Sequence, residues 1–315
     1  MTPQSDGDSG IGTPLLGIII PTAHYSNYLL ALLDSLLSQT DDRWEAIVVD
    51  DSGDGSVAEQ VRDCLRTRRF TWLIHNYNHG IPEAWNSGIR ELFSRNRYGA
   101  MAVVHDDDLL HPDYVKVSLQ LLQQCPEIAV YHYRSRVVNR NTTSMVSIQD
   151  RVKVAMSPQL WGRNYVSRGD SGLAQILANN FVFCPSMVFN LQHFTTIKFE
   201  SRWKFVTDLH FVANALLSGK ALLRYPKPMY IYRRHVGSVT GQLTKTTERF
   251  SEEIALYRDL EQQCLSGGYV RSARVARRRR SIKQHLMFRM VISLCTADWV
   301  QLRKLRLHWR ACTAK

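Results

Sequence analysis

Three consecutive carboxylates, Asp106, Asp107 and Asp108, follow an apolar run at residues 100–104. No basic residue separates them, so they repel one another unless a divalent cation neutralises them or all three face water. Carboxylate oxygens suit Mg²⁺ or Mn²⁺, which commonly keep substrate phosphate oxygens as further ligands. The alternative is an acidic loop that leads into a helix near Pro112. The triplet therefore predicts either a metal–diphosphate site or a solvated loop.

Alternating apolar and amphipathic segments predict the elements that position this triplet. We expect strands at 15–20, 44–49, 70–74 and 100–104, and helices at 25–39, 57–65, 82–93 and 112–124. Strand–helix repeats of this length form right-handed βαβ units and a parallel sheet. The carboxyl ends of parallel strands share one edge, where open α/β sheets bind ligands.

Polar residues follow each of these four strands. They lie at 21–25, 50–51, 76–80 and 106–108. Asp51 can accept hydrogen bonds from a nucleobase or a ribose, and His24 or Tyr25 can stack on a base. Taken alone, Asp50 and Asp51 are equally well explained as an acidic turn that caps a helix. Because four polar segments coincide at one sheet edge, we favour a nucleoside-diphosphate site.

The pattern changes after residue 128. We expect antiparallel strands at 130–138 and 146–154, a loose segment at 157–180, a strand at 181–189, a helix at 207–218, and short strands at 221–225 and 229–233. From Glu248 onward the spacing predicts helices. The expected organisation is a lead-in without regular structure at 1–13, a catalytic domain at 14–245 with halves at 14–127 and 128–245, and a basic helical extension at 246–315.

Four stretches in fixed order carry a family resemblance. IIIPTAHY, WEAIVVDDS, NHGIPEAWNSG and VHDDDLLHP resemble the nucleotide-binding half of family 2 inverting glycosyltransferases. The resemblance covers roughly residues 15–240 and implies the GT-A fold, a Rossmann-like, mostly parallel sheet flanked by helices, here with a helical C-terminal extension. It further implies a nucleotide-diphospho-sugar donor, transfer of a hexosyl group to a saccharide or lipid-linked saccharide as in polysaccharide biosynthesis, and Mn²⁺ or Mg²⁺ as cofactor.

The resemblance also implies which residues meet the donor and the metal. The donor residues would be Pro21, Thr22, His24, Asp51, Asn78, Gly80, Asn86, Asp106, Arg233 and Arg234. The metal would lie on Asp107 first, with Asp106 and Asp108 behind it and His235 from the motif that ends the catalytic core. Many family members have an acid in place of His105. The polar segment 237–245 is expected to order over bound donor.

Asp208 occupies the place of the catalytic base in this resemblance, with Thr207 in place of a preceding acid. Inverting transfer needs a base that takes the acceptor hydroxyl proton during attack on the anomeric carbon. A carboxylate at a helix N-terminus near a metal is expected to stay ionised. The alternatives are that Thr207 and Asp208 only cap the helix, and that Asp170 is the base.

The net charge of +12 belongs to the C-terminal end of the chain. Residues 271–315 contain thirteen Lys and Arg and one acid, Asp298, so the first 270 residues are balanced. Apolar residues recur there at helical spacing: Val275, Ile282, Leu286, Met290, Trp299, Leu302, Leu305 and Trp309. Such helices fit an anionic membrane surface or packing on the catalytic domain with solvated arginines. No nucleic-acid reader motif accompanies the charge, so nucleic-acid binding is the weaker third hypothesis.

The remaining composition narrows the class of protein. The six cysteines include no C-x-x-C pair, which argues against a zinc site or a disulfide framework. No apolar run is long enough to span a bilayer and no signal sequence is apparent, so we expect a cytoplasmic protein, with a peripheral position on the cytosolic face of a membrane as the alternative. A sugar-1-phosphate nucleotidyltransferase is the second enzyme hypothesis. It is disfavoured because PTAHY replaces a Gly-rich basic loop after the first strand.

Overall fold

The computed structural model describes residues 14–62, 69–138, 163–179, 183–234 and 247–313. The first half contains four mutually parallel strands: β1 (Leu16–Thr22), β2 (Trp44–Asp50), β3 (Phe70–Ile74) and β4 (Ala100–Val103). Helices α1 (Asn27–Leu37), α2 (Ser56–Arg62) and α3 (Ile81–Ser94) connect them, and α4 (Tyr114–Gln124) follows. The predicted series of strand–helix units is confirmed in this half.

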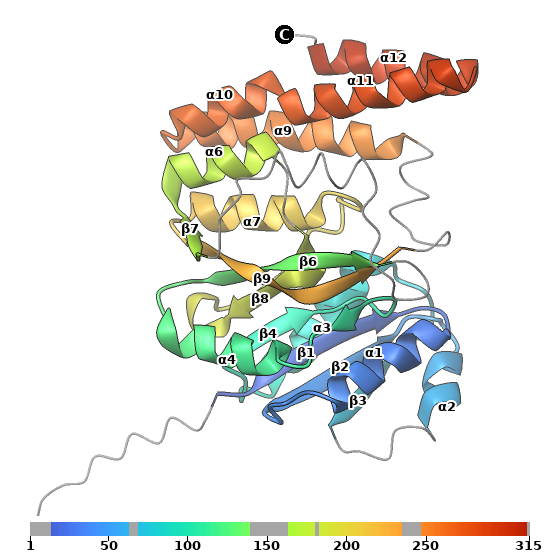
Figure 1. Cartoon of the computed structure of the whole chain (residues 1–315), viewed down its shortest axis with the longest axis vertical. Coiled ribbons are helices and arrows are strands. Elements are labelled where there is room, and N and C mark those ends of the chain that lie inside the picture. Colours follow the sequence, from blue (N-terminus) through green and yellow to red (C-terminus); the bar gives the residue numbers. More distant parts are fainter. Residues whose placement is uncertain (1–13, 63–68, 139–162, 180–182, 235–246, 314–315) are drawn as a thin grey trace, which may run out of the picture.

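The second half completes a mixed nine-stranded sheet (Figure 1). Its strands are β5 (Leu109–Leu110), β6 (Val130–Val138), β7 (Tyr165–Ser167), β8 (Met187–Asn190) and β9 (Leu222–Arg233). The order is β3-β2-β1-β4-β8-β6-β9-β5, and β7 pairs with β9. Because β8 runs antiparallel to both β4 and β6, it joins the parallel first half to the remaining strands.

Three predictions for the second half differ from the structure. The two short strands expected at 221–225 and 229–233 are one strand, β9, whose pairing with β6 shifts register opposite Pro228. Prolines normally interrupt a strand, and here the irregular register accommodates them. The segment expected to be loose contains β7 and helix α6 (Gly169–Asn179).

The third difference is at the strand expected over 181–189. Residues Cys184–Ser186 form a 3₁₀ turn before β8, since Pro185 has a fixed φ and no N–H to give a strand partner. The strand expected at 146–154 lies outside the described residues.

The core consists of two buried layers, one on each face of the parallel strands. Ile19 of β1 faces the layer that contains Ile89 and Leu92 of α3. Ile18 and Ile20 face the opposite layer, which contains residues of α1 and α4. Burial on both faces explains why β1 is a continuous apolar run and not an alternating one.

Besides α6, five helices form layers beyond the α3 side of the sheet (Figure 1). They are α7 (Thr207–Leu217), α9 (Glu248–Ser266), α10 (Val270–Arg278), α11 (Arg280–Cys295) and α12 (Trp299–Thr313). Buried residues of α9, α11 and α12 belong to the same apolar cluster as Ile19. The boundary expected between residues 245 and 246 stays a prediction.

The apolar stripe predicted in the extension mostly packs inside these layers. Ile282, Leu286, Leu302 and Leu305 are buried, whereas Trp299 is 65% exposed. Among the described residues, no helix is both long enough and apolar enough to cross a membrane.

Candidate active site

The carboxylate triplet lies directly after β4 and is tied to the end of β1. The Thr22 hydroxyl donates a 2.7 Å hydrogen bond to Oδ2 of Asp106. Thr22 is 3% exposed, so its side chain is enclosed by protein. The resemblance predicted that Thr22 holds the nucleoside; in the structure its hydroxyl hydrogen is used to position Asp106.

Asp108 is the buried member of the triplet and holds the end of β9. Its two oxygens accept hydrogen bonds from the Tyr230 hydroxyl at 2.5 Å and from the Arg233 backbone N–H at 2.7 Å. Burial, and then repulsion from Asp107, raise the pKa of Asp108 well above its ordinary range. Asp106 and Asp107 are both partly exposed and are therefore more accessible than Asp108, and the predicted order of the metal ligands stays a prediction.

His105, Asp107 and Asp108 form a group that could hold a metal ion. Each offers one ligand atom, and these atoms lie within 4.8 Å of one another. The His105 ring lies 5.8 Å from the Trp85 ring and 6.0 Å from the Phe183 ring. Burial lowers the pKa of His105, which favours the neutral imidazole that binds metals. His235 lies outside the described residues.

Arg233 is a buried cation whose side chain has unused hydrogen-bond donors. It is 3% exposed, and its guanidinium lies 4.6 Å from the centre of the Tyr28 ring. Within the part of the chain that the structure describes, its Nε and Nη2 groups have no hydrogen-bond partner. Burial lowers the pKa of Arg233, and the nearby groups Asp108, Tyr28 and Asp107 oppose that shift. Unpaired buried donors are costly, and diphosphate oxygens are suitable acceptors for them.

Asp51 organises the loop between β3 and α3. Its carboxylate lies 2.7 Å from Nδ1 of His75 and accepts the backbone N–H groups of His79 and Gly80, both at 2.9 Å. The Asn78 amide donates to the Asp51 carbonyl at 2.9 Å. Gly80 has a left-handed φ of 83° at the start of α3, a conformation that favours glycine. Asn78 and Gly80 thus shape this loop, and their predicted contact with the donor stays a prediction.

The other predicted donor residues occupy different environments. His24 is exposed just beyond the end of β1, and Pro21 lies within β1 beside Val49. Arg234 is partly exposed, and its backbone N–H donates to the Val138 carbonyl at 2.9 Å.

Asn86 has a structural role that the resemblance did not predict. Its side chain is 2% exposed and exchanges two 2.8 Å hydrogen bonds with the backbone of Phe199. Both polar groups of the amide are therefore used inside the protein. The contact fastens the segment after β8 to α3.

Asp208 is the second residue of α7 and is partly exposed. Its carboxylate accepts the backbone N–H groups of Leu209 at 2.7 Å and Cys184 at 3.2 Å. Burial raises the pKa of Asp208 to about 6, although these N–H groups and the charge of Arg249 lower it. The N–H groups at the helix N-terminus favour the carboxylate, but desolvation is the larger effect on its pKa, and the expectation that Asp208 stays ionised near a metal stays a prediction. A pKa near neutrality suits a general base.

Phe183 and Cys184 connect Asp208 to the triplet. Cys184 binds Asp208 through its N–H, and the ring of the preceding Phe183 lies against the rings of His105, Tyr230 and Tyr232. Asp208 and His105 beside the triplet therefore contact two consecutive residues, although about a hundred residues of sequence separate Asp208 from the triplet.

Asp170, the other candidate for the base, is a helix cap. Its carboxylate accepts the backbone N–H groups of Arg271 and Ser272 and the Ser272 hydroxyl. All three donors lie at the start of α10. The structure therefore uses Asp170 to fasten α10 to α6.

A half of parallel strands that ends in the Asp106–Asp108 triplet, joined through β8 to a second half, is the arrangement of the GT-A fold. The family model described as glycosyl transferase family 2 matches residues 17–194, and the chain belongs to this family.

Curated relatives agree with this assignment. The putative glycosyltransferase EpsH of Bacillus subtilis is 22% identical over 249 residues, which cover 78% of this chain and 67% of EpsH. An uncharacterized glycosyltransferase of Haemophilus influenzae is 31% identical over 132 residues, 41% of this chain and 42% of that protein. Against an uncharacterized glycosyltransferase of Rickettsia felis, the match covers only 17% of that protein's length.

Solved structures agree in fold. S. aureus TarS 1–349 in complex with UDP-GlcNAc has a TM-score of 0.58 at 13% identity, covering 94% of this chain and 91% of that one. The mannosyltransferase PcManGT from Pyrobaculum calidifontis in complex with GDP-Man and Mn²⁺ has a TM-score of 0.56 at 12% identity, covering 96% and 86%.

Proposed function

We propose that this protein transfers a hexosyl group from a nucleotide-diphospho-sugar to an acceptor hydroxyl with inversion at the anomeric carbon. The observation that carries the proposal is the buried Arg233 guanidinium, whose Nε and Nη2 groups are unpaired among the described residues and which feels the charges of Asp107 and Asp108. A diphosphate with a bound cation can pair with both groups: its oxygens accept hydrogen bonds from Arg233, and its cation binds the carboxylates. The complexes of TarS with UDP-GlcNAc and of PcManGT with GDP-Man and Mn²⁺ support this ligand class.

Each end of the donor has a group of residues assigned to it. Arg233, with Arg234 beside it, would bind the diphosphate. The loop organised by Asp51 and the exposed His24 would meet the nucleoside. Mn²⁺ or Mg²⁺ would be held by Asp107 with His105 and Asp108 behind it, and would neutralise the negative charge of the diphosphate. His235 stays a proposed ligand.

Asp208 is assigned to the acceptor. It takes the proton of the acceptor hydroxyl as that oxygen forms its bond to the anomeric carbon. The bond from this carbon to the diphosphate oxygen breaks, and its electron pair leaves with the nucleoside diphosphate. Arg233 stabilises the charge that develops on this leaving group. Attack opposite to the departing oxygen inverts the configuration. The acceptor class is a saccharide or a lipid-linked saccharide.

Thermal unfolding with a panel of nucleotide-sugars tests the donor assignment. UDP-, GDP- and dTDP-sugars are each added with Mn²⁺, since a ligand that binds the folded state raises its melting temperature. We expect one nucleotide class to stabilise the wild type and Asp107→Asn to abolish that shift. The matched control is Asp34→Asn, an exposed carboxylate on α1. The proposal fails if no nucleotide-sugar shifts the wild type, or if both variants retain the full shift.

A further inference from the structure

The hairpin formed by α11 and α12 carries an exposed apolar surface at its tip. The tip consists of residues 287–295 of α11, the turn at 296–298 and the first turn of α12. Its apolar side chains are between 43% and 70% exposed: Met287, Phe288, Val291, Leu294, Trp299 and Val300. The helical spacing of 287, 291 and 294 places three of them on one face of α11. Buried residues of the same two helices, Leu286 and Leu305, face inward.

The surroundings of this tip are strongly basic. Arg303 and Lys304 follow Trp299 and Val300 on α12 and are exposed. Asp298, at the start of α12, is the one acid between residues 271 and 315, and its carboxylate accepts the Gln301 N–H. Exposed apolar side chains next to exposed cations match the boundary between acyl chains and anionic headgroups.

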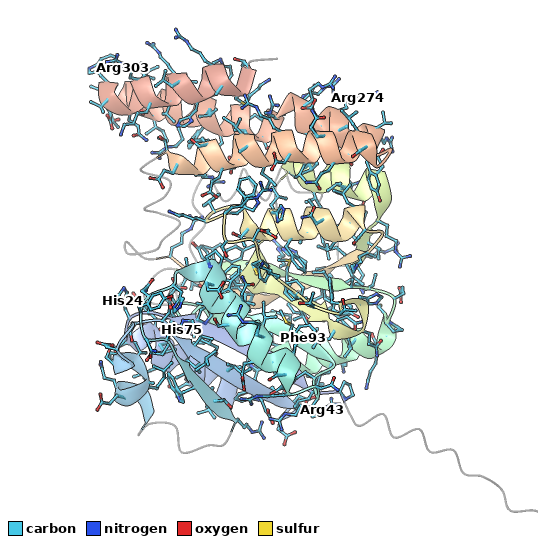
Figure 2. All side chains as sticks on the ribbon, turned by 180° about the vertical axis from the view of Figure 1, so that it is seen from behind. His24, Arg43, His75, Phe93, Arg274 and Arg303 are labelled. Atoms are coloured by element: carbon cyan, nitrogen blue, oxygen red, sulfur yellow. The ribbon has the colours of Figure 1, made fainter. Side chains whose placement is uncertain are left out.

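The tip projects on the same side of the molecule as the donor site. Figure 2 shows Arg303 of α12 on the side that carries His24 and His75, whereas Arg274 of α10 lies at the opposite end of the helical layer. His24 and His75 follow the carboxyl ends of β1 and β3. A flat surface in contact with the tip would therefore face the edge of the sheet where the triplet lies.

We propose that the α11–α12 tip docks on an anionic membrane surface and turns the donor site toward that surface. Apolar side chains enter the headgroup boundary, and Arg303 and Lys304 contact lipid phosphates. A nucleic acid could bind the basic side chains, but its binding would not explain the four exposed apolar side chains on α11. The docking does not depend on the donor chemistry, so it is tested separately.

Co-sedimentation with vesicles tests the docking with matched pairs of variants. The full chain is mixed with phosphatidylcholine vesicles that either contain or lack phosphatidylglycerol. The charge pair is Arg303→Glu with Lys304→Glu, against Arg274→Glu with Arg278→Glu, which makes the same charge change on α10. The apolar pair is Trp299→Ser with Val300→Ser, against Leu265→Ser with Val270→Ser, whose side chains are also exposed.

We expect binding that requires phosphatidylglycerol. Each tip variant should lower the partition coefficient by about tenfold or more, and each control should keep it within about threefold. Equal losses in tip and control variants, or no binding by the wild type, overturn the proposal. Light scattering that shows a dimer of the wild type and a monomer of the Trp299→Ser, Val300→Ser variant also overturns it, because a second copy then covers the tip. The proposal is also overturned if the wild type binds an RNA oligomer and does not bind vesicles.

Discussion

Replacing Asp208 by asparagine removes the proposed base while preserving its shape. Without the carboxylate, no group in that place takes the acceptor proton. A positioned general base contributes about 10²- to 10⁴-fold, so kcat should fall by that factor. The KM for the donor should change little, since Asp208 is assigned to the acceptor and not to the diphosphate. The assay follows release of nucleoside diphosphate by the wild type and the variant.

The pH dependence of the wild type gives a second measure of the same group. With a pKa of about 6, the ionised form exceeds the protonated form by about tenfold at pH 7. The rate of the wild type should therefore fall about tenfold per unit of pH well below 6. The residual rate of Asp208→Asn should lack this acid limb.

The stability of the protein should depend on pH in the opposite direction to the rate, and should fall as the pH rises. Because the folded-state pKa of Asp208 is raised above its ordinary value of 3.8, the folded state holds a proton that the unfolded chain releases. The free energy of unfolding therefore falls by at most about 3 kcal/mol as the pH rises from about 4 to about 6. Partial exposure of the side chain makes this fall smaller. Asp208→Asn should not show the loss.

Asp170→Asn is the matched control, because Asp170 is also a carboxylate at the start of a helix segment. It should cost about 1 kcal/mol of stability through its contacts to α10 while leaving kcat unchanged. Full activity of Asp208→Asn, or an equal loss of kcat in Asp170→Asn, would refute the assignment of the base.

Three further substitutions test neighbouring parts of the site. Arg233→Met keeps an unbranched apolar side chain against Tyr28 and removes the charge. The affinity for nucleoside diphosphate, measured by calorimetry, should therefore fall about 10- to 100-fold. An unchanged affinity would exclude Arg233 from the diphosphate site. His105→Asp replaces a nitrogen ligand by oxygen, and the ratio of Mn²⁺ to Mg²⁺ affinity should fall, as titration of each ion in the presence of nucleoside diphosphate will show; a constant ratio contradicts the ligand role. Arg249→Met removes a charge that lowers the pKa of Asp208, so the acid limb of the rate profile should move to higher pH, and a shift to lower pH would contradict the sign.

The nucleotide-binding half was predictable from the sequence because its strands are buried on both faces. A short continuous apolar run between two helical segments, such as 15–20 or 44–49, is most readily explained as a buried strand. The strands β1 and β2 lie where they were expected. The second half was less predictable. Pro185 and Pro228 sit inside sheet-forming segments, and the spacing of apolar residues does not show how pairing accommodates them.

The site was predictable at the level of segments and less so at the level of side-chain roles. The positions of Asp51, Asp107 and Asp208 follow from strand ends and a helix start. The use of Thr22 to hold Asp106 and of Asn86 to hold Phe199 depends on contacts between residues far apart in sequence. Neither periodicity nor motif order contains those contacts.

Tyr28 and Phe183 were missed for a similar reason. Each looks like an ordinary apolar member of a helix or a strand. Their rings contact Arg233 and His105 only after β9 and the 3₁₀ turn have folded against the triplet. A search for aromatic residues near each polar strand end would have included Tyr28, the second residue of α1, which follows the end of β1.

Time-resolved NMR of the anomeric proton tests the proposed reaction most directly. The wild type is incubated with Mn²⁺ and an α-linked form of the nucleotide-sugar that stabilises it, with water as the acceptor. Inverting transfer predicts that the β-anomer of the free sugar and the nucleoside diphosphate appear first, and that Asp208→Asn slows both equally. First appearance of the α-anomer would contradict inversion by direct displacement at this site.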